Sequence, residues 1–212
     1  GPHGCCILSQ EFYETRAEHD FLRGYTMQIL RGTPPIETAT SGYFMRQLSI
    51  GKNHHKDFEK LFNHSAGIAI ISEDLPEEHN RVELDFDNKD SFGLPGVKVY
   101  YEVSDNTKKI LKHGMKMSKE IFSSAGAKVT ASFAPVKNSG WHLMGTARMG
   151  ENKNTSVVNK YGQSHQVKNL FIVDSSVFVT SGAVNPVATA QAITLFACNY
   201  IRENASSISN SS

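Results

Sequence analysis

The sequence contains little cysteine and almost no excess charge of either sign. Only three of its 212 residues are cysteines, and Cys5 stands next to Cys6, a spacing that gives neither a repeated disulfide framework nor a CxxC pair. We therefore expect free thiols. Twenty-two Lys and Arg residues are balanced by 21 Asp and Glu residues, which leaves a formal net charge of +1. This balance removes the electrostatic basis for nucleic acid as a partner.

Long hydrophobic runs are also missing. Ser, Gly, Asp or Asn interrupts every apolar stretch well before the roughly 20 residues that a membrane span needs, so no span is predicted in this segment. Hydrophobic residues nevertheless make up 39% of the chain and charged residues 20%, a composition typical of a folded globular protein.

Several short signatures of cofactor binding and catalysis are absent. No two glycines stand at positions i and i+2, which excludes the dinucleotide-binding fingerprint GxGxxG, and neither a P-loop nor a GxSxG elbow occurs. The nine histidines form no HExxH or similar ligand pattern, so we predict solvated histidines and no metal site.

The first residues, Gly1-Pro2-His3, include neither a methionine nor a charged-then-apolar leader. We expect a piece of a longer protein. Any signal peptide would then lie upstream of these residues, so the localisation is left open.

Periodicity in the first two thirds predicts a mostly antiparallel sheet with helices, an α+β fold. Gly67 to Ser72 form a short apolar run, Arg81 to Phe86 alternate, and the residues from Val97 to Val103 place their valines on one face, as strands do. Ser104 and Gly126 bracket an amphipathic helix as its caps.

Signals nearer the start of the chain are weaker. They predict a short helix between Lys52 and Phe62, and a turn at Thr40-Ser41-Gly42.

The last third has a different residue pattern. Asn169 to Asp174 is a dense apolar segment that ends in an acid, the pattern of a strand buried in a parallel sheet. Asn185 and Pro186 predict the start of a helix, as its N-cap and first residue, which continues to about Arg202. The free amides at the start of this helix suit an anion or an electron-rich carbonyl.

Four blocks in this last third carry a family resemblance. They are Trp141-His142-Leu-Met-Gly-Thr-Ala-Arg-Met-Gly150, Ser156-Val-Val-Asn159, Lys168-Asn-Leu-Phe-Ile-Val-Asp-Ser-Ser-Val-Phe178, and Gly182-Ala-Val-Asn185-Pro186 with Thr189 and Ala190. In this order they resemble the C-terminal part of the glucose-methanol-choline (GMC) family of flavin oxidoreductases.

The resemblance implies roles for particular residues. It places His142 at the family's active-site histidine and Asn185 at the second active-site position. Asp174, Ser175 and the backbone of Asn185-Pro186-Val187 match the stretch that contacts FAD. The family's glycine-rich N-terminal motif is missing, so the missing partner is the N-terminal FAD-binding portion.

The resemblance and the change in residue pattern also divide the chain into domains. We expect a substrate-binding domain over residues 1–135, then the last strand and the C-terminal helix of a Rossmann-like FAD domain over 136–203. A flexible tail would follow over 204–212.

Residue chemistry agrees with the resemblance. Hydride removal from an alcohol carbon requires loss of the hydroxyl proton, and imidazole changes charge near neutral pH, so His142 can act as the base. The Asn185 amide can donate a hydrogen bond to the substrate oxygen.

We therefore expect an FAD-dependent oxidoreductase that acts on the CH-OH group of an alcohol or sugar, inactive as a fragment, with its electron acceptor left open. Two alternatives stay open. They are a non-catalytic binding domain that kept the fold, and a metal-dependent hydrolase built on the histidines.

Overall fold

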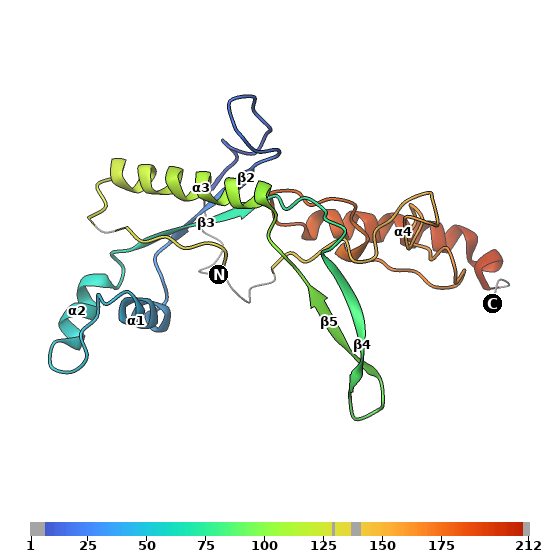
Figure 1. Ribbon diagram of the computed structural model, residues 1–212, viewed down its shortest axis with the longest axis horizontal. Coiled ribbons are helices and arrows are strands. Elements are labelled where there is room, and N and C mark those ends of the chain that lie inside the picture. The colour runs from blue at the N-terminus through green and yellow to red at the C-terminus, as the bar shows by residue number, and fades with distance from the viewer. Residues whose placement is uncertain (1–6, 129, 137–140, 210–212) are drawn as a thin grey trace.

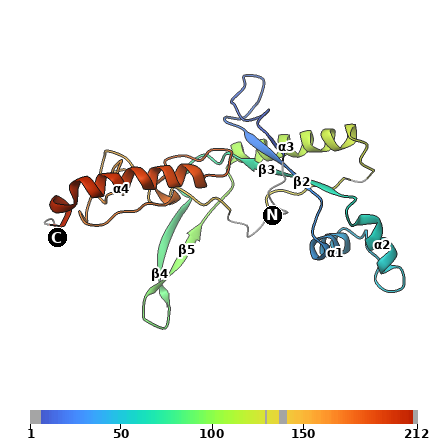
Figure 2. The same cartoon turned by 180° about the vertical axis from the view of Figure 1, so that it is seen from behind.

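The computed structural model describes residues 7–128, 130–136 and 141–209. The molecule is extended, with helices α1 (Pro35–Phe44) and α2 (His54–Leu61) at one end and helix α4 (Val187–Ser209) at the other (Figures 1 and 2). Cys198 is an exposed free thiol. Cys5 and Cys6, for which thiols are expected, lie outside the described residues.

A three-stranded antiparallel sheet forms the centre of the first two thirds. Its strands are β1 (Ile7–Ser9), β2 (Tyr25–Arg31) and β3 (Ala66–Ser72), in the order β1-β2-β3. The sequence pattern predicted β3, and the β2–β3 register is unbroken from one end of β2 to the other. Because side chains alternate along a strand, β2 presents one face to a helix and leaves the other for different contacts.

Helix α3 (Asp105–Ser124) covers the first of these faces. The predicted caps are confirmed, since Ser104 accepts a hydrogen bond from the Thr107 amide and Gly126 has the left-handed φ of +81° typical of a helix end. Apolar side chains of the helix and the sheet form the core, namely Phe21, Tyr25, Met27 and Ile110, with Phe12, Ile68, Ile70 and Met117 packed around them.

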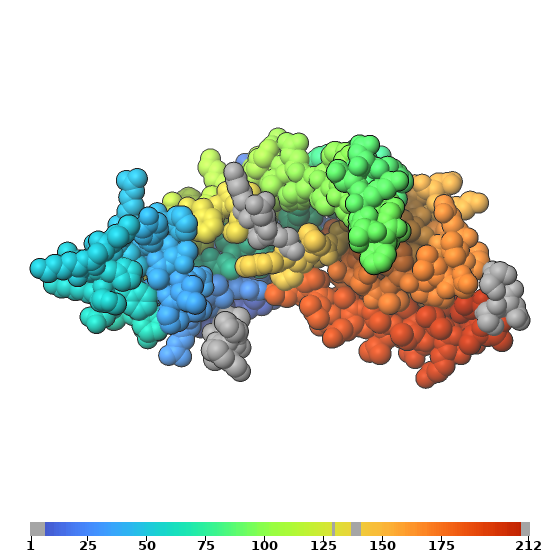
Figure 3. Space-filling model, turned by 90° about the horizontal axis from the view of Figure 1, so that it is seen from below, coloured from blue at the N-terminus to red at the C-terminus, as the bar shows by residue number. Residues whose placement is uncertain are grey.

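Strands β4 (Arg81–Lys89) and β5 (Pro95–Tyr100) form an antiparallel hairpin at the predicted place. The hairpin projects from the body of the molecule (Figure 1), and it stands in front of its neighbours when the molecule is seen from below (Figure 3). Val82 pairs with Val99 and Leu84 with Val97, so these side chains share one face. All four are exposed, by 45% to 70%.

Two helices precede β3. The predicted short helix is confirmed as α2 (His54–Leu61), whereas the turn predicted at Thr40-Ser41-Gly42 is wrong because these residues lie inside α1 (Pro35–Phe44). Gly42 is buried against Leu48 and Leu61, and this packing overrides the turn preference of the three residues.

The last third contains little regular structure apart from α4 (Val187–Ser209). Asn169 to Asp174 is not a strand of any sheet among the described residues, and it forms one isolated bridge, between Phe171 and Gln163. Helix α4 was predicted, but it continues past Arg202, so Asn204–Ser209 is helical and not a tail. The division into domains at about residue 135 falls beside residues that are not described, and it stays a prediction.

Candidate functional site

The loop that carries His142 lies along the segment that contains Asp174 and Ser175. A ladder of backbone hydrogen bonds joins the two, from Gly145 N to Ser175 O (3.2 Å), Ala147 N to Ser176 O (2.9 Å) and Met149 N to Val177 O (2.8 Å). The Ser175 hydroxyl adds a bond to the Leu143 carbonyl (2.8 Å). Two of the motifs singled out in the sequence are therefore neighbours in space.

His142 itself has an unusual backbone. Its φ of 62° lies in the left-handed region, which a residue with a side chain seldom adopts. The residue is half-buried, and its imidazole makes no hydrogen bond with another group in the described ranges. As far as the described residues go, the ring nitrogens are free to act on a bound molecule.

Asp174 and Ser175 begin a single 3-10 turn, η2 (Ser175–Val177). Asp174 caps this turn, because its carboxylate accepts a hydrogen bond from the Ser176 amide (2.8 Å). The bonds from Ser176 lower the pKa of Asp174 below its ordinary value. The carboxylate is exposed and carries its charge at neutral pH.

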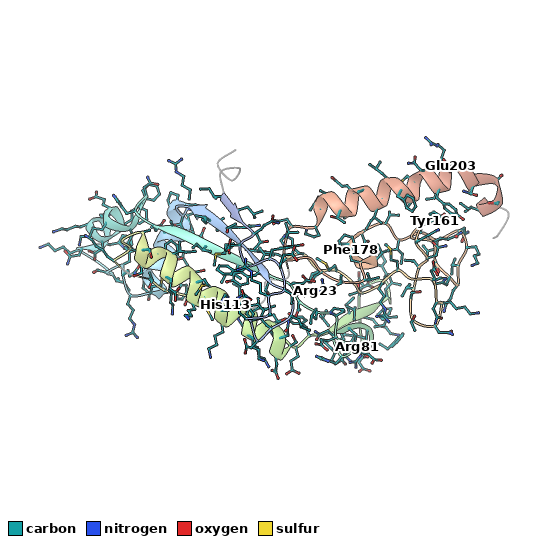
Figure 4. The ribbon with its side chains drawn as sticks, turned by 90° about the horizontal axis from the view of Figure 1, so that it is seen from above. Arg23, Arg81, His113, Tyr161, Phe178 and Glu203 are labelled. Atoms are coloured by element: carbon teal, nitrogen blue, oxygen red, sulfur yellow. The ribbon has the colours of Figure 1, made fainter. Side chains whose placement is uncertain are left out.

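Helix α4 packs along this segment. The Thr194 hydroxyl donates to the Val173 carbonyl (2.6 Å), and the ring of Tyr161 stacks on that of Tyr200 with 3.8 Å between centroids. Tyr161 lies directly beside α4 (Figure 4). These contacts fix the position of α4 relative to Asp174.

Asn185 lies two residues before the start of α4, one position further from the helix than the sequence indicated. The helix begins at Val187, and the Pro186 carbonyl accepts the first helical bond, from the Ala190 amide (2.9 Å). Pro186 therefore occupies the N-cap position. The Asn185 side chain does not cap the helix but accepts a hydrogen bond from the Gln28 amide on β2.

The segment before Asn185 is tied to the end of β3 at two further points. The Thr180 side chain hydrogen bonds to Glu73. Ser181 uses its hydroxyl twice, accepting from the Asp74 amide (3.1 Å) and donating to the Asp74 carbonyl (2.8 Å).

The Asp74 carboxylate also connects the segment around Ser181 to the start of α3. Its two oxygens accept from the Tyr101 hydroxyl (2.7 Å) and from the Thr107 hydroxyl (2.7 Å). Residues 180–185, β3 and the start of α3 therefore meet at Asp74.

Glu73 is a buried carboxyl beside this junction. Burial raises the pKa of Glu73, while the nearby Arg23 and the hydrogen bond from Thr180 oppose the rise. The Arg23 guanidinium is 3.6 Å from the carboxylate, and it lies at the centre of the molecule (Figure 4).

The predicted site residues thus fall into two groups. His142 and Ser175 are joined through Leu143, and Asn185 is joined to the β1–β2–β3 sheet. That His142 and Asn185 share one cavity stays a prediction.

Within residues 7–128, 130–136 and 141–209, no three His, Cys, Asp or Glu side chains are grouped as a metal ion would require. In the same part of the chain no helix has the length and hydropathy to cross a bilayer.

Comparison with known proteins identifies the family. Residues 76–194, which include the hairpin, α3, the His142 loop and Asn185, match the family model described as GMC oxidoreductase. The chain belongs to the GMC oxidoreductase family. The expected family and the α+β fold are therefore confirmed.

Curated relatives of this GMC oxidoreductase chain are oxidoreductases named for alcohols and sugars. A 2-methyl-1,2-propanediol dehydrogenase of Mycolicibacterium austroafricanum is 39% identical over 210 residues, which are 98% of this chain and 38% of that protein. The fructose dehydrogenase large subunit of Gluconobacter japonicus is 29% identical over 155 residues, which are 72% of this chain and 28% of that subunit. The chain thus spans well under half the length of these relatives.

Two residues of the site were missed from the sequence. Gln28 and Asp74 stand in ordinary strand and loop patterns, and their partners Asn185 and Ser181 are more than 100 positions away. No local signal marks such a pair, since only the folded chain brings them together.

Proposed function

We propose that this GMC oxidoreductase chain forms the substrate side of an active site in an FAD-dependent enzyme that oxidises the CH-OH group of an alcohol or sugar. One observation carries the proposal. The backbone ladder holds the loop of His142 against the segment of Asp174 and Ser175, so the proposed base and part of the proposed FAD contact belong to one hydrogen-bonded arrangement.

The start of α4 fits the cofactor. The Ala190 amide donates the first hydrogen bond of the helix, to the Pro186 carbonyl. The amides of Val187, Ala188 and Thr189 come earlier in the chain and therefore have no carbonyl of the helix as an acceptor. These amides and the helix dipole suit an electron-rich carbonyl or an anion. When bound, FAD would supply the redox chemistry by accepting the hydride from the alcohol carbon. Asp174, Ser175, Asn185, Pro186 and Val187 are the residues proposed to contact it.

The protein groups handle the proton and the oxygen. An imidazole nitrogen of His142 takes the hydroxyl proton of the substrate as the C-H electron pair leaves. The Asn185 amide donates a hydrogen bond to the same oxygen, on which negative charge develops before the carbonyl product forms. Among the residues that the structure describes, neither side chain has a hydrogen-bond partner at the atoms that these roles need.

The experiment is stopped-flow measurement of flavin bleaching in the full-length protein with a saturating alcohol. His142→Ala is expected to slow bleaching by about 10²-fold or more while FAD stays bound, and Asn185→Ala by about 10²-fold. His55→Ala, which removes an exposed histidine of α2, is the matched control and should bleach at the wild-type rate. A wild-type rate in the His142 variant removes His142 from the mechanism.

A further inference from the structure

The hydrogen bond between Gln28 and Asn185 crosses from the β1–β2–β3 sheet to the segment that begins α4. Gln28 is half-buried in the middle of β2, whereas Asn185 is exposed. The Gln28 Nε2 donates and the Asn185 Oδ1 accepts. The direction of this bond matters because an Asn side chain has one accepting and one donating end.

Among the described residues, no group accepts a hydrogen bond from the donor end of the Asn185 amide. With Oδ1 engaged by Gln28, the Nδ2 group is the end of the amide that remains available to a bound molecule. A free Nδ2 donates to an oxygen, whereas the reversed amide would present an acceptor and repel that oxygen.

The surroundings of Gln28 favour this partner. Its cross-strand neighbours are Leu8 on β1 and Ala69 on β3, and both are apolar. Directly opposite residues in antiparallel strands place their side chains on the same face. The Gln28 amide therefore has no polar neighbour in its own row, and Asn185 is the group to which it donates.

The position of Asn185 is fixed as well. Ser181 is bonded twice to the Asp74 backbone, Ala183 is fully buried, and Pro186 restricts the conformation of the residue before it. The backbone at Asn185 is therefore constrained, and the remaining freedom lies in the orientation of its side-chain amide. The Gln28 bond removes that freedom.

We propose that Gln28 is a positioning residue that orients the Asn185 amide so that its Nδ2 faces the substrate oxygen. The inference rests on the proposed function, because it assigns Gln28 a task in the same reaction. Gln28 acts through Asn185 and not on the substrate itself.

The test uses the FAD-loaded full-length enzyme and a substitution that reverses the bond. In Gln28→Glu the carboxylate can only accept, so Asn185 is expected to turn its Nδ2 towards residue 28 and its Oδ1 towards the substrate. Flavin bleaching at saturating alcohol should slow by about 10²-fold, as when an oxyanion donor is lost. Gln10→Glu adds the same charge at an exposed side chain and should leave the rate unchanged.

A second variant separates orientation from structural damage. Gln28→Met keeps the shape but removes the donor, and loss of one hydrogen bond should slow bleaching by up to about 10-fold. If Gln28 acts through Asn185, Gln28→Met will cause no further loss in an Asn185→Ala background. An equal loss in both backgrounds would overturn the inference, as would a wild-type rate in Gln28→Glu.

These outcomes are distinct from failure of the proposed function. If the wild-type enzyme holds FAD but no alcohol or sugar bleaches it, the proposed function falls and the inference falls with it. If wild type is active and Asn185→Ala is slow while Gln28→Glu is unaffected, the function stands and the inference alone is wrong.

Discussion

Gly162 is the position where a single added methyl group should disturb the His142 region from a distance. Its φ is +72°, and a Cβ built there would lie 2.4 Å from the Ile172 carbonyl oxygen. The same two residues are joined by a hydrogen bond from the Ile172 amide to the Gly162 carbonyl (2.8 Å). The obstacle is therefore backbone, which cannot rotate away as a flexible side chain could.

The expected cost of Gly162→Ala has two parts. A left-handed conformation costs an L-residue about 1–2 kcal/mol. Relief of the clash requires the Ile172 backbone to move, which breaks or weakens its hydrogen bond to Gly162. Loss of this bond costs about 0.5–1.5 kcal/mol of stability, and some steric overlap with the new methyl group remains. The loss of unfolding free energy should thus reach about 2–4 kcal/mol, roughly twice the conformational part alone.

Gly93→Ala is the matched control. Gly93 also has a left-handed φ, +82°, but nothing lies within 4 Å of the Cβ position. At about 2–4 °C per kcal/mol, thermal unfolding should show a clearly larger fall in Tm for Gly162→Ala than for Gly93→Ala. Because Asp174 and Ser175 follow Ile172 closely, Gly162→Ala should also slow flavin bleaching. Equal Tm values for the two variants would refute the steric argument.

Two further predictions concern pH and the cofactor. Burial, with the neighbouring His19 and Lys116, lowers the pKa of His113. The unfolded chain therefore binds a proton at His113 more readily than the folded chain does. The contribution of neutral His113 to the free energy of unfolding should be complete above about pH 6.5 and should decline as the pH falls below this value. Tm measured from pH 5 to 8 should show this slope and lose part of it in His113→Gln; an unchanged slope would contradict the assignment. The 212 residues expressed alone should bind FAD more weakly than micromolar in a fluorescence titration, because they contain no GxGxxG to hold its phosphates. Micromolar or tighter affinity would show that these residues contain a complete cofactor site.

Elements with local signals could be predicted from the sequence. Ser104 and Gly126 mark the ends of α3 through the hydrogen-bonding and conformational preferences of single residues. Likewise, the alternation around Val97 and Val99 indicates a strand without reference to the rest of the fold. Helix α1 was missed because Gly42 is held by packing against distant residues, which local preferences do not register.

The site was predictable only in part, for a related reason. An apolar run such as Asn169 to Asp174 specifies extended backbone but not the partner strands, and among the described residues it has a single bridge. The family blocks pointed to His142, Asn185 and Ser175, and the structure adds how their segments are held. The Gln28 bond depends on two residues that meet only after the sheet and the α4 segment have come together.

The ties between the sheet and residues 180–185 also limit how such enzymes can be recombined. A chimera that imports a foreign β1–β2–β3 sheet with the residues after β3 would keep Asn185 but give it a new neighbour at position 28, and it would replace the Asp74 backbone to which Ser181 is bonded. The sheet is therefore not a module that can be exchanged by itself. Residue 28, residues 73–74 and residues 180–185 form the smallest set that should be grafted together.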